Sequence, residues 1–470
     1  MASLRISPIA FNQVLNENRQ LLTISKVAAS EVVAKEESNE EKTHVAFTSV
    51  RQERWQGELQ VEGEILQWLK GTYLRNGPGI WHVGDYNLQH LFDGYAALVC
   101  LNLDSGRLVM GHRQIESEAY KAAQKNKKVC FRASLTDNTM TGVVKLGDGR
   151  VLCLTETQKG SILIDPNTLE TLGKFEYTDN LGGLIQAAHP IVTNTEYITL
   201  LPDLINPGRQ VVRMDPGTNE RKLMVRVNCR GRPSPEWVHS FPMTENYVVV
   251  LEMPLGYCPQ NLLKAELTEL YKFQWLPDSK AYMHVMCKAT GKTVPPFVTF
   301  HFINAYEETD EEGRVMAVIA DRCEHNADPA ILPNLSLHNY TTKMVGRFRI
   351  PIDGIPNGTL EAALDPNEHG RGMDMCSINS NFSGKKYRLL WTRRLRASAR
   401  NALSRPSPSL WLCRVPLEKM MVNVVIFMVS QKNGDGFALV LDGTTFEEIA
   451  RAKFPYDLPY GLHGCWVPKN

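Results

Sequence analysis

Four histidines lie in stretches whose pattern predicts strands or strand ends. They are His189 in AAHPIV, His239 in WVHSFP, His301 in FHFINAYEE and His463 in YGLHG. The first two are each followed eight residues later by a tyrosine and then by aliphatic residues, and His301 repeats this plan with its turn at TDEEG. These three histidines are therefore each expected to end one strand, before a turn into the next.

Histidine side chains suit metal chemistry, because imidazole is a ligand for zinc, iron, copper and nickel. Four imidazoles are neutral, so they would not reduce the charge of a bound divalent metal. In an octahedral site they would also leave coordination positions open, which suits an iron(II) ion that reacts with dioxygen. A hydrolytic zinc site usually has three protein ligands, a water and a nearby base, and no convincing base stands beside these histidines in the sequence. The alternative for each single histidine is a core residue that is hydrogen-bonded to a neighbour.

A ligand histidine also needs its second ring nitrogen held, often by a carboxylate. Two acids in otherwise apolar β-runs are candidates for this role: Glu156 in VLCLTETQKG and Asp374 in GRGMDMCSIN. A buried charge without a partner would be costly, so each carboxylate is expected to have one. Glu156 fits a turn or an edge of a sheet equally well.

The elements that would position these side chains are predicted to be strands, because short alternating runs are separated by turns rich in Gly, Asp, Asn and Pro. One unit, a strand that ends at Asp followed by a turn and a second strand, recurs at Asp104, Asp165, Asp215, Asp278, Asp353 and Asp442. Aspartate favours such turns because its side chain accepts backbone N–H bonds. Six copies and one apparent gap predict an all-β, seven-bladed β-propeller. A large sandwich or several small β domains are the competing interpretation.

A propeller would bring the histidines together, because the innermost strand of each blade faces the central axis. Equivalent positions in successive blades converge there, and His189, His239 and His301 are 50 and 62 residues apart. His463 lies 162 residues further along, on a C-terminal strand that would close the ring against the first blade. The pattern therefore predicts a metal on the central axis.

The bulk composition is that of a globular chain. Its 470 residues carry 52 basic and 51 acidic side chains, a net charge of +1, so no overall field favours nucleic acid. Ten cysteines without a C-x-x-C pair argue against a zinc ribbon or a redox dithiol. The apolar run at 420–429 is too short for a transmembrane segment.

The N-terminal residues differ from the rest. The first stretch is basic and rich in hydroxyl residues, and an acidic, polar stretch follows. Residues 1–45 are therefore predicted to be a transit peptide and a disordered linker, with a merely disordered N-terminus as the alternative. Residues 46–470 are predicted to form one propeller domain.

Seven motifs, in order along the chain, resemble the carotenoid cleavage oxygenase family: YLRNGPGIW, HLFDGYAAL, LTET, AAHPIV, WVHSFP, FHFINAYEE and YGLHG. The resemblance implies a seven-bladed propeller with non-haem iron(II) (Fe²⁺) on its axis, held by His189, His239, His301 and His463. It places Glu156 at a carboxylate position behind one ligand and Asp374 near another, where relatives often have Glu.

The same resemblance implies an enzyme that uses dioxygen to cleave a conjugated double bond of an apocarotenoid. It implies the chloroplast stroma as location and allows peripheral membrane contact, while the balanced net charge predicts no nucleic-acid partner. Finer motifs, such as GHRQIESEAYKAA and CEHNAD, resemble a plant branch of the family that converts a cis-configured apocarotenal to carlactone in strigolactone biosynthesis.

Two segments depart from the family pattern. Residues 385–419 carry ten Lys or Arg and a single acid, Glu418, where relatives have an acid-containing stretch, so one blade region is expected to be atypical. Residues 129–140 are shorter than in relatives, in a region that helps to form the substrate entrance. These departures leave a second hypothesis open, a non-catalytic or inactive propeller, and a disordered basic loop is the alternative for 385–419.

Overall fold

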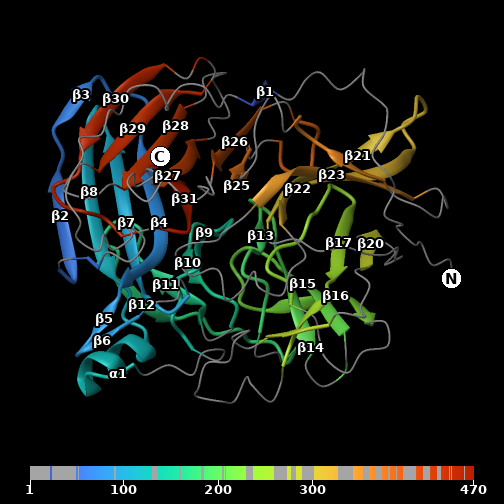
Figure 1. The fold of residues 1–470 in the computed structure, drawn as a ribbon, viewed down its shortest axis with the longest axis horizontal. Helices are drawn as coiled ribbons and strands as arrows, with labels where there is room; N and C mark the ends of the chain where they lie inside the picture. Colours follow the sequence, from blue (N-terminus) through green and yellow to red (C-terminus); the bar gives the residue numbers. More distant parts are fainter. Residues whose placement is uncertain are drawn as a thin grey trace, which may run out of the picture.

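The computed structural model is built from small sheets of consecutive, mostly antiparallel strands (Figure 1). It describes residues 22–23, 49–50, 52–88, 92–129, 136–157, 160–181, 185–203, 206, 208–228, 237–258, 273–276, 282–287, 301–325, 342–352, 359–365, 373–378, 382–387, 389–394, 409–415, 424–430, 436–443, 445, 447–459 and 461–469.

Five sheets of four or five strands form blades, and within each blade every strand is hydrogen-bonded to its neighbours in the sheet. In spatial order, the first blade is β31 (His463–Pro468), β4 (Gly71–Ile80), β7 (Tyr95–Asp104), β8 (Arg107–Gln114) and β2 (Arg54–Glu58). A second blade consists of β9 (Gly142–Lys145), β10 (Val151–Leu154), β11 (Ile162–Ile164) and β12 (Thr171–Lys174). A third consists of β13 (Ile191–Val192), β14 (Tyr197–Asp203), β15 (Gly208–Met214) and β16 (Arg221–Asn228). A fourth consists of β21 (Phe302–Thr309), β22 (Val315–His325), β23 (Thr342–Pro351) and β24 (Thr359–Ala362). The last consists of β27 (Ser409–Val415), β28 (Val424–Ser430), β29 (Phe437–Asp442), β30 (Glu448–Lys453) and β3 (Val61–Gly63).

Smaller sheets occupy the two sequence intervals between these blades. The first interval holds the pair β17 (Tyr247–Glu252) and β20 (Tyr282–Cys287), with β18 (Leu255–Tyr257) and β19 (Phe273–Trp275) beside it in sequence. The second holds β25 (Met373–Ser377) and β26 (Leu389–Arg394), and the N-terminal strand β1 (Leu22–Thr23) pairs with β26. The remaining elements are β5 (His82–Val83), β6 (Tyr86–Asn87) and the helix α1 (Glu118–Asn126). This is a propeller arrangement, in which the described residues complete five blades.

The ring closes by pairing between the two ends of the chain. The C-terminal strand β31 adds to β4 as the innermost strand of the first blade, while β3 adds to β30 at the outer edge of the last. In Figure 1 the red C-terminal strands therefore lie beside the blue N-terminal ones. The strand β31 also contacts β9 and β27, so the innermost strands of three consecutive blades are neighbours.

The repeated aspartate turn has one structural position. Asp104, Asp165, Asp215 and Asp442 each connect the third and fourth strands of their blade, counted from the innermost strand. The carboxylate of Asp165 accepts the backbone N–H of Asn167 at 2.7 Å, as this turn chemistry requires. The repeat is thus confirmed at these four positions, whereas Asp278 and Asp353 lie outside the described residues.

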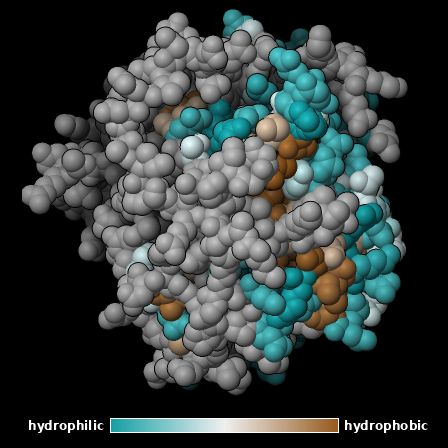
Figure 2. Space-filling view, turned by 90° about the vertical axis from the view of Figure 1, so that its right-hand side faces the viewer, coloured by the Kyte–Doolittle hydropathy of each residue, from teal (hydrophilic) through white to brown (hydrophobic). Residues whose placement is uncertain are grey.

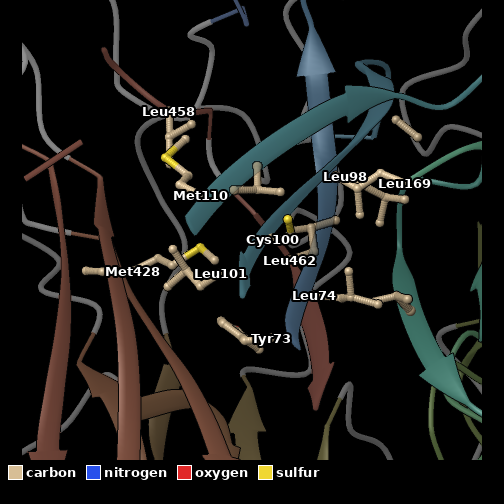
Figure 3. Close-up of a cluster of buried hydrophobic side chains, with 14 of the residues drawn as sticks. Tyr73, Leu74, Leu98, Cys100, Leu101, Met110, Leu169, Met428, Leu458 and Leu462 are labelled. Atoms are coloured by element: carbon tan, nitrogen blue, oxygen red, sulfur yellow. The ribbon is translucent and has the colours of Figure 1, made fainter. Parts of the chain in front are cut away.

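The largest apolar cluster extends across the closure (Figure 3). Leu101 and Met110 of the first blade lie there near Met428 of the last blade and Leu458 of the C-terminal segment. Burial of each such side chain stabilises the fold by about 1.5–3 kcal/mol. Closure is therefore held by packing as well as by the backbone bonds of β31 and β3.

Part of the atypical basic segment is regular structure. Within 385–419, β26 pairs with β25 and β27 pairs with β28. These two stretches are strands rather than the disordered loop considered as an alternative. Residues 395–408 and 416–419 lie outside the described residues, as do residues 130–135 of the shortened segment.

In the part of the chain that the structure describes, no helix is long and apolar enough to cross a bilayer. The large apolar side chains that are exposed, Tyr86, Leu172, Leu223 and Phe382, belong to separate parts of the chain. On the face seen in Figure 2 the described hydrophobic residues form strips bordered by hydrophilic ones. Peripheral membrane contact stays a prediction.

Candidate metal centre

Three of the four histidines lie at or just before the innermost strand of a blade. His189 lies two residues before β13, His301 lies directly before β21, and His463 begins β31. His239 lies in the segment that leads to β17. The expected position at the end of a strand is wrong for His189 and His301, because both precede an innermost strand. A position at or just before the start of an innermost strand is what brings His189, His301 and His463 together.

The four imidazoles converge on one point. One ligand atom from each of the four lies within 4.8 Å of the others. The ring centre of His189 is 4.6 Å from that of His239, 5.3 Å from that of His301 and 4.2 Å from that of His463. The backbone N–H of His189 donates to the carbonyl of His239 at 3.2 Å, which ties two of the supporting segments together.

This donor set fits a late first-row divalent metal. The Nε2 atoms of His189 and His239 are 3.0 Å apart, a distance at which two lone pairs repel unless a proton or a cation lies between them. A metal ion relieves this repulsion for all four rings at once. In the described residues the cluster consists of imidazoles and includes no carboxylate, which favours iron, zinc, copper or nickel over magnesium or calcium.

Glu156 holds one of these rings. Its Oε1 accepts a hydrogen bond from Nδ1 of His239 at 2.8 Å and one from the indole Nε1–H of Trp237 at 3.0 Å. Donation from Nδ1 leaves the Nε2 lone pair of His239 directed toward the other imidazoles. Burial raises the pKa of Glu156 to about 7, although the bond from Trp237 lowers it. A divalent cation in the centre would favour the carboxylate form.

Trp237 is a site residue that sequence reasoning missed. Besides its bond to Glu156, its ring packs beside that of His239 with centres 5.3 Å apart. The signal was present, because residues two apart in an extended segment share one face. Trp237 thus buttresses both the carboxylate and the imidazole that the carboxylate orients.

Asp374, the other predicted carboxylate, lies in β25 opposite Arg393 of β26 in the register of that pair. Its side chain lies outside what the structure describes. Its role behind a ligand therefore stays a prediction.

Replacement of Glu156 by alanine is expected to weaken metal binding about 10–100-fold, because His239 then loses the acceptor that orients it. Titration with cobalt(II) in competition with a chelator measures this. Glu170→Ala is the matched control, since Glu170 accepts from Arg113 at the surface. Equal affinity of the Glu156 variant and the wild type would exclude this role.

Two other histidines, among the described residues, are buried and hydrogen-bonded to groups outside the metal centre. The Nε2 of His284 lies 2.5 Å from the carboxylate of Glu252 in the buried β17–β20 pair. His112 of β8 is buried, with Nε2 at 2.8 Å from the carbonyl of Gln52 and Nδ1 against the hydroxyl of Tyr456. Since a carbonyl only accepts, Nε2 carries the hydrogen and the tyrosine donates to Nδ1.

Burial lowers the pKa of His112, so the unfolded chain takes up a proton at higher pH than the folded chain. Above about pH 6.5 this group contributes no pH dependence, and below it stability falls by up to about 1.4 kcal/mol per pH unit until the folded pKa is reached. The variant His112→Gln has no side chain that takes up a proton at this position, so its stability lacks this pH-dependent contribution. The difference between wild-type and variant unfolding temperatures should therefore narrow as metal-free samples go from neutral to mildly acidic pH. A difference that stays constant would contradict the expectation.

Comparison with known proteins places these features in a family. The family model described as "Retinal pigment epithelial membrane protein" matches residues 47–413 and 423–468. That match includes residues 385–413 of the basic segment.

Two curated plant proteins are similar over nearly their whole length. "Carotenoid cleavage dioxygenase 8 homolog B, chloroplastic" from Oryza sativa subsp. japonica is 58% identical over 483 residues, which cover 91% of this chain and 85% of that protein. "Carotenoid cleavage dioxygenase 8, chloroplastic" from Arabidopsis thaliana is 50% identical over 512 residues, which cover 95% of this chain and 90% of that protein.

Among solved structures, a mutant of the Synechocystis apocarotenoid oxygenase matches with a TM-score of 0.74 at 20% identity, over 90% of this chain and 98% of that chain. The cobalt-substituted Synechocystis enzyme matches with a TM-score of 0.72, at the same identity and coverage. At this identity the likeness concerns the fold, and it confirms the predicted β-propeller.

Proposed function

Because this chain belongs to the carotenoid cleavage oxygenase family, whose model is described as retinal pigment epithelial membrane protein, we propose that it is an iron(II)-dependent dioxygenase of apocarotenoids. The observation that carries the proposal is the convergence of His189, His239, His301 and His463 on one point. These four residues would hold the metal. Bound iron(II) supplies the redox chemistry by which dioxygen reacts with a conjugated double bond.

The chain's own residues supply orientation rather than acid–base chemistry. Cleavage of a C=C bond by dioxygen gives two carbonyl groups, with no net gain or loss of protons, so no general acid or base is needed. Glu156 fixes the tautomer of His239, and Trp237 anchors Glu156. All three side chains act before the substrate arrives, by keeping the imidazoles in place.

The surroundings of the centre suit an apolar substrate. Trp237, beside His239, is itself packed against Phe273 with ring centres 5.3 Å apart. The half-buried Phe302 follows His301 and packs against the same apolar cluster. A polyene has no polar groups along its length, so apolar walls must position it.

The finer proposal concerns substrate and location. The names of the two plant relatives place them in class eight of the carotenoid cleavage dioxygenases and in the chloroplast. We propose that the present chain is likewise a chloroplast enzyme, and that it converts a cis-configured apocarotenal to carlactone in strigolactone biosynthesis. Residues 1–45 would be the transit peptide and linker, nearly all of them outside the described residues, and 46–470 the catalytic domain.

The rival hypothesis is a non-catalytic or inactive propeller, motivated by the basic segment 385–419 and the shortened segment 129–140. Two observations favour the active enzyme. The family match runs through residue 413, and β26 and β27 pair within their sheets in this segment.

The test is to load the purified chain with iron(II) without air and then supply apocarotenals under ¹⁸O₂. The expected result is a single iron per chain and ¹⁸O from dioxygen in the cleavage products. A folded chain that takes up no iron, or one that takes it up and cleaves no apocarotenal, would contradict the proposal and favour the inactive propeller.

A further inference from the structure

His463 reaches the centre by a different route from the other three histidines. It arrives on the C-terminal strand β31, which pairs with β4 along one edge. In the register of this pair His463 lies opposite Asn76. The backbone carbonyl of Asn76 also accepts the N–H of Leu462 at 2.8 Å. The place of the fourth imidazole therefore depends on this part of β4.

The side chain of Asn76 is fully buried, at 0% exposure. Its Nδ2 donates to the carbonyls of Thr139 and Gly142, at 2.6 and 2.9 Å, and its Oδ1 accepts the N–H of Gly77 at 2.9 Å. Two donors and an acceptor within one short side chain are a property of asparagine. Aspartate would turn an oxygen toward two carbonyl oxygens, and leucine would remove all three hydrogen bonds.

The two carbonyls belong to residues 139–142, which lead into β9 and lie against His463. A Cβ atom on Gly142 would be 3.8 Å from the Cβ of His463, and β9 contacts β31. Asn76 thus connects the two structures on either side of this histidine, β4 by its backbone and residues 139–142 by its amide.

The neighbouring residue holds the chain that leads to His463. Arg75, also buried, donates from Nη2 to the carbonyl of Pro459 at 2.9 Å. A Cβ atom on Gly461 would lie 2.2 Å from Cδ of Arg75, so a residue without a side chain is required for this close approach. Consecutive residues of β4 therefore fix both the approach to His463 and its final position.

We propose that Asn76 is a positioning residue for the metal centre, which acts by holding His463 between β4 and residues 139–142. This inference rests on the proposed function, because it takes the four histidines as the metal ligands. It assigns a role to a side chain that touches neither the metal nor the substrate.

A double-mutant cycle tests the proposal, with cobalt(II) as the probe, since a cobalt-substituted relative has been crystallised. Cobalt affinity, cobalt release to a chelator and the visible absorption of the bound metal are measured for Asn76→Ala, Asn76→Ser, His463→Ala and the combinations with His463→Ala. Asn304→Ala is the matched control, since the Asn304 amide donates to the carbonyls of Phe382 and Lys385 and accepts the N–H of Gly384.

If Asn76 acts through His463, Asn76→Ala weakens cobalt binding on the order of tenfold and shifts the visible absorption bands. In the His463→Ala background the same change has no further effect on affinity, because its target is gone. Asn304→Ala lowers the unfolding temperature but leaves cobalt affinity and absorption as in the wild type.

The other outcomes distinguish failure of the positioning role of Asn76 from failure of the proposed metal centre. If His463→Ala leaves cobalt affinity unchanged, the metal centre itself is refuted. If His463→Ala weakens binding while neither Asn76 variant does, or if the effects of the two sites simply add, the positioning role is refuted and the centre stands. Loss of folding in both Asn76→Ala and Asn76→Ser would also overturn it, since Asn76 would then serve the fold as a whole.

Discussion

Replacement of His301 by alanine is expected to empty the metal centre and abolish turnover. Binding of a divalent metal by four protein ligands in structural sites involves about 10–16 kcal/mol, so loss of one ligand removes roughly 3 kcal/mol, or about a hundredfold in affinity. The three remaining imidazoles still lie close together, so weak binding can persist at high metal concentration. Metal content after gel filtration and cleavage of an apocarotenal measure the two losses.

The control is His82→Ala, which removes the same side chain from β5, where His82 is exposed and pairs with Ser49. This variant should keep both iron and activity. Full iron content and turnover in the His301 variant would mean that His301 is a core residue and that the centre is elsewhere. The comparison separates loss of a ligand from a general effect of losing a histidine.

Replacement of Arg347 by methionine is expected to destabilise the fold by about 3–5 kcal/mol, because it leaves a buried carboxylate without its charge partner. Asp321 has 0% exposure and receives two bonds from Arg347, at 2.7 and 2.9 Å. It accepts a third from the hydroxyl of Tyr387 at 2.7 Å. Denaturant unfolding of the metal-free chain gives the free-energy difference.

Arg349→Met is the matched control, two residues further along the same strand β23. Arg349 pairs with Glu308 at 2.6 Å, but both side chains are more than a third exposed, and exposed pairs contribute at most about 1 kcal/mol. If the two variants lose the same stability, burial of Asp321 does not have the importance assigned to it. A large loss confined to Arg347→Met would show that this buried carboxylate joins β22 to β23 and to Tyr387.

The elements that local chemistry controls could be predicted from the sequence. A turn at Asp165 needs only the carboxylate and the two or three following N–H groups, so its signature is complete within a few residues. Tyr197 and Tyr247, matched by their spacing from His189 and His239, begin β14 and β17. The same repetition of local units indicated the propeller, and histidine as a residue type indicated the metal chemistry.

What the sequence left open depends on contacts between distant residues. The burial of His112 is an example, because its partners Tyr456 and Gln52 are far away in the chain. The bond from Trp237 to Glu156 likewise joins two blades. The sequence named Glu156 as a candidate but not Trp237, and it could not show that the two side chains are in contact.

The clearest case is His463. By itself the sequence determined that a histidine stands near the C-terminus in a strand-like stretch, and repeated turns elsewhere determined the kind of fold. Only the tertiary structure decided that this histidine lies 4.2 Å, ring to ring, from His189. The reason is that turn and strand formation are short-range, whereas closure of a ring by β31 on β4 depends on the sum of the rotations of all the blades.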